Sequence, residues 1–297
     1  MEPPKAPTDS QSHRRRVVIG IAAGVALLAA AAGGFWRFVR KVKRTYVAGI
    51  VWQPDRATID PHGDWQKLGV DTLLVQWSVI DGLALLPVPG IPAFQPQPNW
   101  TRIAAEPWAK SVVLGLAGNF SEEVSRRDVV HLAETSRLLA AQARRTSLNV
   151  TGYYFPVEVD PTWAEAPALA KLLAPLPRPL WISIYDGGNI GAETLADWLK
   201  TWLPEDIGVF FQDGVGVYAR SPKEAARYAN VLSAWLGRGR FAVVVEAFRP
   251  QVGGGFRPAT PQELRPQIAA YGNLRCFLFD GPHYVNRALV AALTCRN

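Results

Sequence analysis

The sequence predicts an α/β fold, a (β/α)8 barrel of eight parallel strands, preceded by one N-terminal transmembrane helix or signal segment. After residue 45, short apolar runs rich in β-branched and aromatic residues alternate with longer stretches of helical period. Eight such units fit in about 250 residues, the usual length of this barrel. An open doubly wound sheet is the alternative, but no glycine-rich phosphate turn follows the first strand.

The first 44 residues differ in composition from the rest of the chain. Residues 1–16 are polar and basic, with few apolar side chains to bury, so we expect them to be disordered. Residues 17–36 are uncharged, and about 20 such residues cross a bilayer core. This stretch predicts a transmembrane helix or a cleaved signal segment, and residues 37–44 a basic juxtamembrane linker.

The net positive charge of the protein comes entirely from this N-terminal part. Of 32 Lys and Arg and 25 Asp and Glu, nine basic and two acidic residues precede residue 45, which leaves 23 of each sign in the rest. A neutral domain over residues 45–297 argues against nucleic acid as a partner. The five basic residues of 37–44 would by themselves favour the cytoplasmic side for that domain.

The strands are expected at residues 46–53, 71–77, 111–117, 150–158, 180–186, 207–213, 241–246 and 275–280. Helices are expected at 125–145, 192–203, 221–237 and 260–272. Ser125, Ser221 and Thr260 are predicted N-caps, the last two with proline at the first helical position. Residues 83–107, rich in proline and tryptophan, are too long for a tight turn and are predicted to lie over the barrel mouth.

Polar and aromatic residues gather where the predicted strands end, and active sites of such barrels lie at that face. One acid after a strand is usually a helix cap or turn former, but here almost every strand ends this way. The predicted site residues are Gln53, Gln76, Trp77, Asn119, Tyr154, Glu158, Asp160, Tyr185, Asp186, Gln212, Asp213, Glu246, Asp280 and His283.

Glu158 and Glu246 follow the most apolar of these runs. Burial raises a carboxyl pKa, which suits a general acid, while hydrogen-bond donors keep a second carboxylate ionised. Cleavage of a glycosidic bond uses such a pair. The alternative is that one of them anchors a loop, with Arg249 as a ready partner for Glu246.

Glutamates ending strands four and seven resemble the arrangement in the clan of retaining (β/α)8 glycoside hydrolases. The motifs GIVWQPD, GVDTLLVQW, GYYFPVEVDPTW, FFQDGVGV and VVVEAF are similar to a bacterial family of predicted glycosidase barrels, labelled a domain of unknown function and often associated with exported polysaccharides. The resemblance implies Glu158 as acid/base and Glu246 as nucleophile, with Gln53, Gln76, Gln212 and Asp213 in the pocket. Val157 stands where well-known clan members have Asn.

Two further predictions concern Asp213 and the tryptophans. Asp213, followed by Gly214 and Gly216, is an alternative nucleophile or auxiliary acid on a turn that backbone can bring close to a ligand. Trp52, Trp77, Trp100 and Trp163 lie at or beyond strand ends and could offer flat faces to sugar rings. Trp181, Trp198, Trp202 and Trp235 are expected in the core.

Other chemistries find little support in the sequence. The four histidines lack metal-ligand spacing, and neither G-x-S-x-G nor a phosphate-binding loop occurs, so we expect no metal and no cofactor. Cys276 and Cys295 could be bridged or reduced.

The sequence therefore predicts a glycosidase of the retaining kind, acting on a bacterial exopolysaccharide or related glycan. The alternatives are a non-catalytic saccharide-binding scaffold of a polysaccharide synthesis or export system, and an anchored enzyme that faces the cytoplasm. Because polysaccharide lies outside the cytoplasm, we expect a single-pass inner-membrane protein with its domain in the periplasm, or an exported protein after cleavage.

Overall fold

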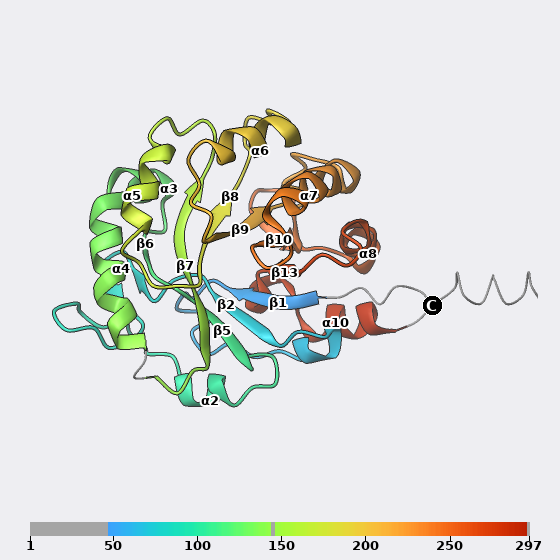
Figure 1. The fold of residues 1–297 in the computed structure, drawn as a ribbon. Coiled ribbons are helices and arrows are strands. Elements are labelled where there is room, and N and C mark those ends of the chain that lie inside the picture. The colour runs from blue at the N-terminus through green and yellow to red at the C-terminus, as the bar shows by residue number, and fades with distance from the viewer. Residues whose placement is uncertain (1–46, 144–145, 296–297) are drawn as a thin grey trace, which may run out of the picture. The chain divides into compact units, whose positions relative to one another are not determined.

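The structure is a computed structural model that describes residues 47–143 and 146–295. Eight parallel strands form a closed barrel in the order β1-β13-β10-β9-β8-β7-β5-β2 (Figure 1). These strands are β1 (Val47–Trp52), β2 (Thr72–Val75), β5 (Ser111–Gly115), β7 (Val150–Val159), β8 (Leu180–Ile184), β9 (Ile207–Gln212), β10 (Phe241–Glu246) and β13 (Cys276–Phe279).

The predicted α/β barrel is confirmed for this part of the chain. Each barrel strand pairs in parallel with the strand before it in the barrel sequence, and β13 returns to pair with β1. The predicted segments 1–16, 17–36 and 37–44 lie outside the described residues. Among the residues that are described, no helix is long and apolar enough to span a bilayer.

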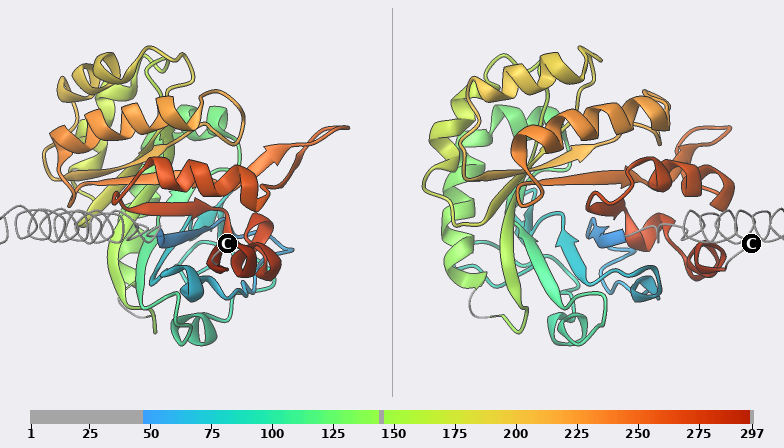
Figure 2. Two further views of the ribbon diagram at one scale, coloured as in Figure 1. Left: turned by 90° about the vertical axis from the view of Figure 1, so that its right-hand side faces the viewer. Right: turned by 45° about the vertical axis from the view of Figure 1, so that its right-hand side comes forward.

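Helices surround the barrel, as the two views of Figure 2 show. Ser221 and Thr260 cap α7 and α8 through their side-chain oxygens, and proline occupies the first turn of each, as predicted. The helices are α2 (Trp100–Ala104), α3 (Glu122–Arg127), α4 (Val129–Ala143), α5 (Leu169–Leu173), α6 (Ala192–Lys200), α7 (Pro222–Leu236), α8 (Pro261–Ala270), α9 (Gly281–Tyr284) and α10 (Arg287–Thr294), with 3-10 turns η1 (Trp65–Leu68) and η2 (Ala166–Ala168).

The prediction that Ser125 caps the helix after β5 is wrong. Ser121 is the N-cap, accepting a hydrogen bond from the Val124 amide, and the short helix α3 precedes α4. Ser125 is buried inside α3, where its hydroxyl bonds the backbone of Asn119. The N-cap therefore lies four residues earlier than expected, and Glu122 lies in the first turn of α3.

Side chains of each strand alternate between the barrel interior and the layer beneath the helices. The interior holds a separate apolar cluster that includes Leu74, Trp181, Phe210 and Phe277. Residues next to these in sequence, such as Leu73 and Phe211, pack in the larger cluster under the helices. The interior cluster fills the barrel, so a ligand site must lie above it.

Residues 83–107 support one side of the barrel mouth. Two short strands, β3 (Val79–Ile80) and β4 (Leu83–Ala84), join β6 (Ala117–Gly118) in a small sheet. Leu85 packs in a small cluster with Trp77, and Trp100 donates from its ring nitrogen to the Leu85 carbonyl at 2.8 Å. The segment thus packs against Trp77, and none of residues 83–107 lines the pocket described next.

Candidate active site

A pocket of ≈160 Å³ lies at the carboxyl ends of the barrel strands. Its floor consists of side chains from the interior cluster, and its walls carry polar groups. The lining residues are Val51, Gln53, Leu74, Gln76, Trp77, Phe120, Glu122, Tyr154, Glu158, Ser183, Phe210, Gln212, Val244 and Phe279. Of the fourteen predicted site residues, the structure brings six together here: Gln53, Gln76, Trp77, Tyr154, Glu158 and Gln212.

Glu158 is the predicted catalytic residue that reaches this pocket. The register of pairing between β7 and β8 shifts between Phe155 and Glu158, near the end of β7. The Gln212 amide donates to Glu158 Oε2 at 2.6 Å, and Arg126 Nη2 lies 3.9 Å from Oε1. Burial raises the pKa of Glu158, while Gln212 and Arg126 act in the opposite direction.

Glu122 is a pocket carboxylate that the sequence analysis missed. Its Oε2 accepts the backbone amide of Glu158 at 3.0 Å. Burial, followed by the charge of Glu158, raises its pKa to about 7. The signal was present in the sequence: Ser121 followed by two glutamates is typical of a helix start, but the helix was expected to begin at Ser125.

Glu246 ends β10 as predicted but does not line the pocket. Its side chain is 6% exposed, and Oε2 accepts the Val217 amide at 3.2 Å. A Cβ at Gly216 would lie 2.5 Å from Glu246 Cβ, so only glycine lets this loop close over the carboxyl group. Burial, followed by nearby Asp213, raises the pKa of Glu246 to about 8, which keeps the group protonated at neutral pH.

Asp213 lies on the opposite side of its strand from Gln212. Because strand side chains alternate, the pocket position of Gln212 directs Asp213 outward. There its Oδ2 accepts hydrogen bonds from Gln267 Nε2 at 2.7 Å and from the Tyr271 hydroxyl at 2.8 Å. Its Oδ1 accepts hydrogen bonds from the backbone amides of Val215 and Glu246. The carboxylate is fully buried and fully used within the fold.

Asp160 and Asp186 also bind neighbouring loops. Asp160 accepts from Thr162 and from the Gly187 amide, which ties the loops after β7 and β8 together. Asp186 is fully buried and accepts the Tyr228 hydroxyl of α7 at 2.8 Å. These are the cap and turn roles that single acids after strands usually have.

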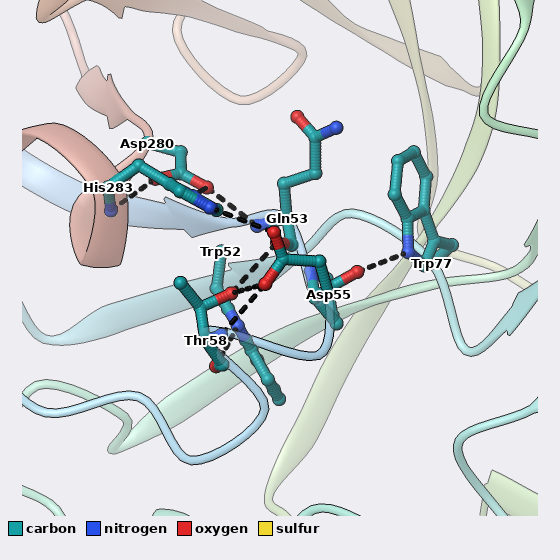
Figure 3. A network of polar contacts seen from close by, with 8 residues as sticks. Trp52, Gln53, Asp55, Thr58, Trp77, Asp280 and His283 are labelled. Atoms are coloured by element: carbon teal, nitrogen blue, oxygen red, sulfur yellow. Dashed lines mark hydrogen bonds and ion pairs between the residues drawn. The ribbon is translucent and has the colours of Figure 1, made fainter. Parts of the chain in front are cut away.

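Asp280, His283 and Asp55 form a network beside the pocket (Figure 3). Asp280 caps α9 and accepts hydrogen bonds from the backbone N–H of Gln53 and from His283 Nδ1, whereas His283 Nε2 lies 3.1 Å from Asp55 Oδ2. The hydrogen bond to Asp280, followed by its charge, outweighs burial and raises the pKa of His283 to about 9. The network fixes the loop after β1, and the Gln53 side chain extends away from it.

Amide and aromatic groups complete the pocket. The Tyr154 hydroxyl donates to Ser183 at 2.9 Å, and the Trp77 ring nitrogen donates to the Pro54 carbonyl at 3.2 Å. The Trp77 ring lies 5.5 Å from that of Phe120, which is 61% exposed. Aromatic faces beside amides suit the binding of a sugar ring. Asn119 and Tyr185 lie near the strand ends, outside the pocket lining.

Burial shows where two of the tryptophans and the two cysteines lie. Trp52 is fully buried against Trp100, with ring centroids 5.6 Å apart, so its predicted role as a sugar platform is wrong. Trp181 lies in the barrel interior, as expected for a core residue. Cys276 is buried, Cys295 is exposed, and both are free thiols.

In residues 47–143 and 146–295, no group of three or more His, Cys, Asp or Glu could hold a metal ion. The pocket itself holds two carboxyl groups, those of Glu122 and Glu158. One carboxyl can give a proton and a second can accept one, with amides and rings positioned to orient a polyhydroxylated ligand.

Solved structures with the same fold include glycoside hydrolases. A putative alpha-L-fucosidase of Bacteroides thetaiotaomicron matches 84% of this chain and 91% of its own, with a TM-score of 0.55 and 16% identity. The PgaB (BpsB) glycoside hydrolase domain of Bordetella bronchiseptica matches over 83% and 98%, with a TM-score of 0.51 and 14% identity. No protein-family model and no curated protein matches the chain. At these identities the likeness shows the fold, a closed eight-stranded parallel barrel.

Proposed function

We propose that this protein hydrolyses a glycosidic bond in a polysaccharide or oligosaccharide, with Glu158 as a reacting carboxylate. The observation that carries the proposal is the position of Glu158: it lies in a pocket at the carboxyl ends of the barrel strands, beside amide and aromatic groups. The barrel shared with a putative alpha-L-fucosidase and with a glycoside hydrolase domain supports this reaction class.

A bacterial exopolysaccharide is the proposed substrate class. The support is the resemblance that the sequence motifs carry to a family associated with exported polysaccharides. The fold shared with the PgaB glycoside hydrolase domain supports the reaction class alone. A pocket of ≈160 Å³ is smaller than typical sites for drug-sized ligands, so we propose that it receives a single sugar ring of the chain.

Replacement of Glu158 tests the proposal. Wild type should release reducing ends from at least one glycan of a polysaccharide panel, and Glu158→Gln should lower kcat by about 10²–10⁴-fold while binding that glycan within a few-fold of wild type. The exposed Glu165, which follows the same strand, supplies the control Glu165→Gln. If wild type binds a glycan without cleaving it, the protein is instead a saccharide-binding scaffold.

We also propose that the domain functions outside the cytoplasm, tethered or released. The support is the uncharged stretch 17–36 and the extracytoplasmic location of the proposed substrate. Alkaline phosphatase fused after Asn297 should be active in bacterial cells, because it requires the oxidising periplasm. An inactive phosphatase fusion with an active cytoplasmic reporter at the same position would contradict this placement.

A further inference from the structure

Helix α3 holds the end of β7 through two residues one turn apart. Glu122 accepts the amide of Glu158 at 3.0 Å, and Arg126 Nε donates to the carbonyl oxygen of the same residue at 3.3 Å. Arg126 also lies over the Trp163 ring, 5.6 Å from its centroid. Residues four apart share a helix face, so side chains of α3 form hydrogen bonds with both the backbone N–H and the backbone carbonyl of Glu158.

The same contacts bring two carboxyl groups into one pocket. Glu122 and Glu158 both line it, and the nearest cation is Arg126, at 3.9 Å from Glu158. The Gln212 side chain donates to Glu158, whereas the hydrogen bond to Glu122 comes from a neutral backbone amide, that of Glu158. The groups that face Glu122 are thus Glu158 and Tyr154 from β7 and Arg126 from its own helix. One cation beside two half-buried carboxylates favours retention of a proton.

We propose that Glu122 is a catalytic residue of this pocket and forms with Glu158 a carboxyl pair that holds a single proton. The inference rests on the proposed glycosidic cleavage. In one turnover the pair gives a proton to the glycosidic oxygen, which keeps the electron pair of the breaking bond to the anomeric carbon. The pair takes one proton back from the water whose oxygen bonds to that carbon, so its proton count is restored.

This pairing differs from the one that the sequence resemblance implies. Glu246 was expected as the partner of Glu158, but its carboxyl group lies beneath Gly216 and Val217, outside the pocket lining. Glu122 reaches the pocket from the helix after β5 instead. The pKa of Glu122, about 7, agrees with a group that exchanges protons near neutral pH.

Kinetics across pH 5–9 test the pair on a glycan that wild type cleaves. Glu122→Gln should lower kcat at least 100-fold and remove the inflection of the pH profile near neutrality. The adjacent, exposed Glu123 gives the matched control Glu123→Gln, which should behave as wild type. An E122Q enzyme within two-fold of wild type and with an unchanged profile would overturn the inference while leaving the proposed function intact.

A titration needs no substrate and separates the two failures. Beside Glu246, whose pKa is about 8, carbon-13 NMR of glutamate carboxyl groups should show a second signal, that of Glu122, titrating near pH 7 in wild type. That signal should vanish in Glu122→Gln and move toward ordinary glutamate values in Glu158→Gln, because the neighbouring charge is gone. An unmoved midpoint in E158Q would overturn the pair. If the titration behaves as expected but no glycan is cleaved, the proposed function fails instead.

Discussion

At the residue scale, alternation along a strand separates groups that face ligand from groups that hold the barrel together. Gln212 lines the pocket, and Asp213, the next residue, is buried on the other side with Gln267 and Tyr271 as donors. Both are polar residues at the end of one strand, so composition makes them look alike. Gln212 and Asp213 nevertheless have different roles, because successive side chains of a strand point to opposite sides.

Replacement of Asp213 tests its structural role. Asp213→Ala leaves the Tyr271 hydroxyl without its acceptor and leaves the Gln267 amide only its longer hydrogen bond, to the Glu246 carbonyl oxygen. We therefore expect the free energy of unfolding to fall by about 2–4 kcal/mol. Urea denaturation measures the change. Asp197→Ala, in an exposed ion pair with Lys200, is the control and should change stability by less than about 0.5 kcal/mol. An equally stable D213A protein would show that the network is dispensable.

At the scale of elements, close approach of strands and loops determines the shape of the barrel mouth. Gly115 lies at the end of β5, where a Cβ would come within 2.3 Å of the carbonyl oxygens of Val75 and Gln76. Since backbone atoms cannot move aside cheaply, β2 and β5 can pair at this point only with glycine.

Substitution of Gly115 should therefore disturb the pocket wall that Gln76 and Trp77 form. We expect Gly115→Ala to lower the free energy of unfolding by at least about 2 kcal/mol and to weaken glycan binding. Thermal unfolding and a binding assay measure both effects. Gly239→Ala is the matched control, because nothing lies within 4 Å of its Cβ position. Wild-type stability in G115A would contradict the packing described for β2 and β5.

At the scale of the whole molecule, buried and paired groups set how stability depends on pH. Glu122 and Glu246 have a pKa raised from ordinary values near 4.5 to about 7 and about 8, and that of His283 is raised from 6.5 to about 9. A group with a raised folded-state pKa contributes stability that is full below its unfolded pKa and is lost as pH rises through the folded value. The free energy of unfolding therefore falls as pH rises, over about pH 4.5–7 through Glu122, pH 4.5–8 through Glu246 and pH 6.5–9 through His283.

We expect the urea midpoint to fall steadily from pH 5 to pH 9. Glu246→Gln, which cannot ionise, should be more stable than wild type at pH 9 by on the order of 3 kcal/mol and close to it at pH 5. His283→Gln should flatten the curve above pH 6.5. A midpoint that rises with pH, or an E246Q protein without any advantage at pH 9, would show that these groups are not held as described.

The sequence by itself determined the barrel, the order of its strands and the face on which the candidate pocket lies. Period-two and helical patterns are local, and eight alternating units leave few ways to bury their apolar faces. It also identified six pocket residues, including Glu158. Tertiary structure decided which polar side chains meet: the Glu246 carboxyl group lies beneath Gly216, whereas Glu122 lines the pocket. The helix that carries Glu122 is capped by Ser121, four residues before the predicted cap. Such meetings depend on side-chain direction and on contacts between distant residues, which no local pattern encodes.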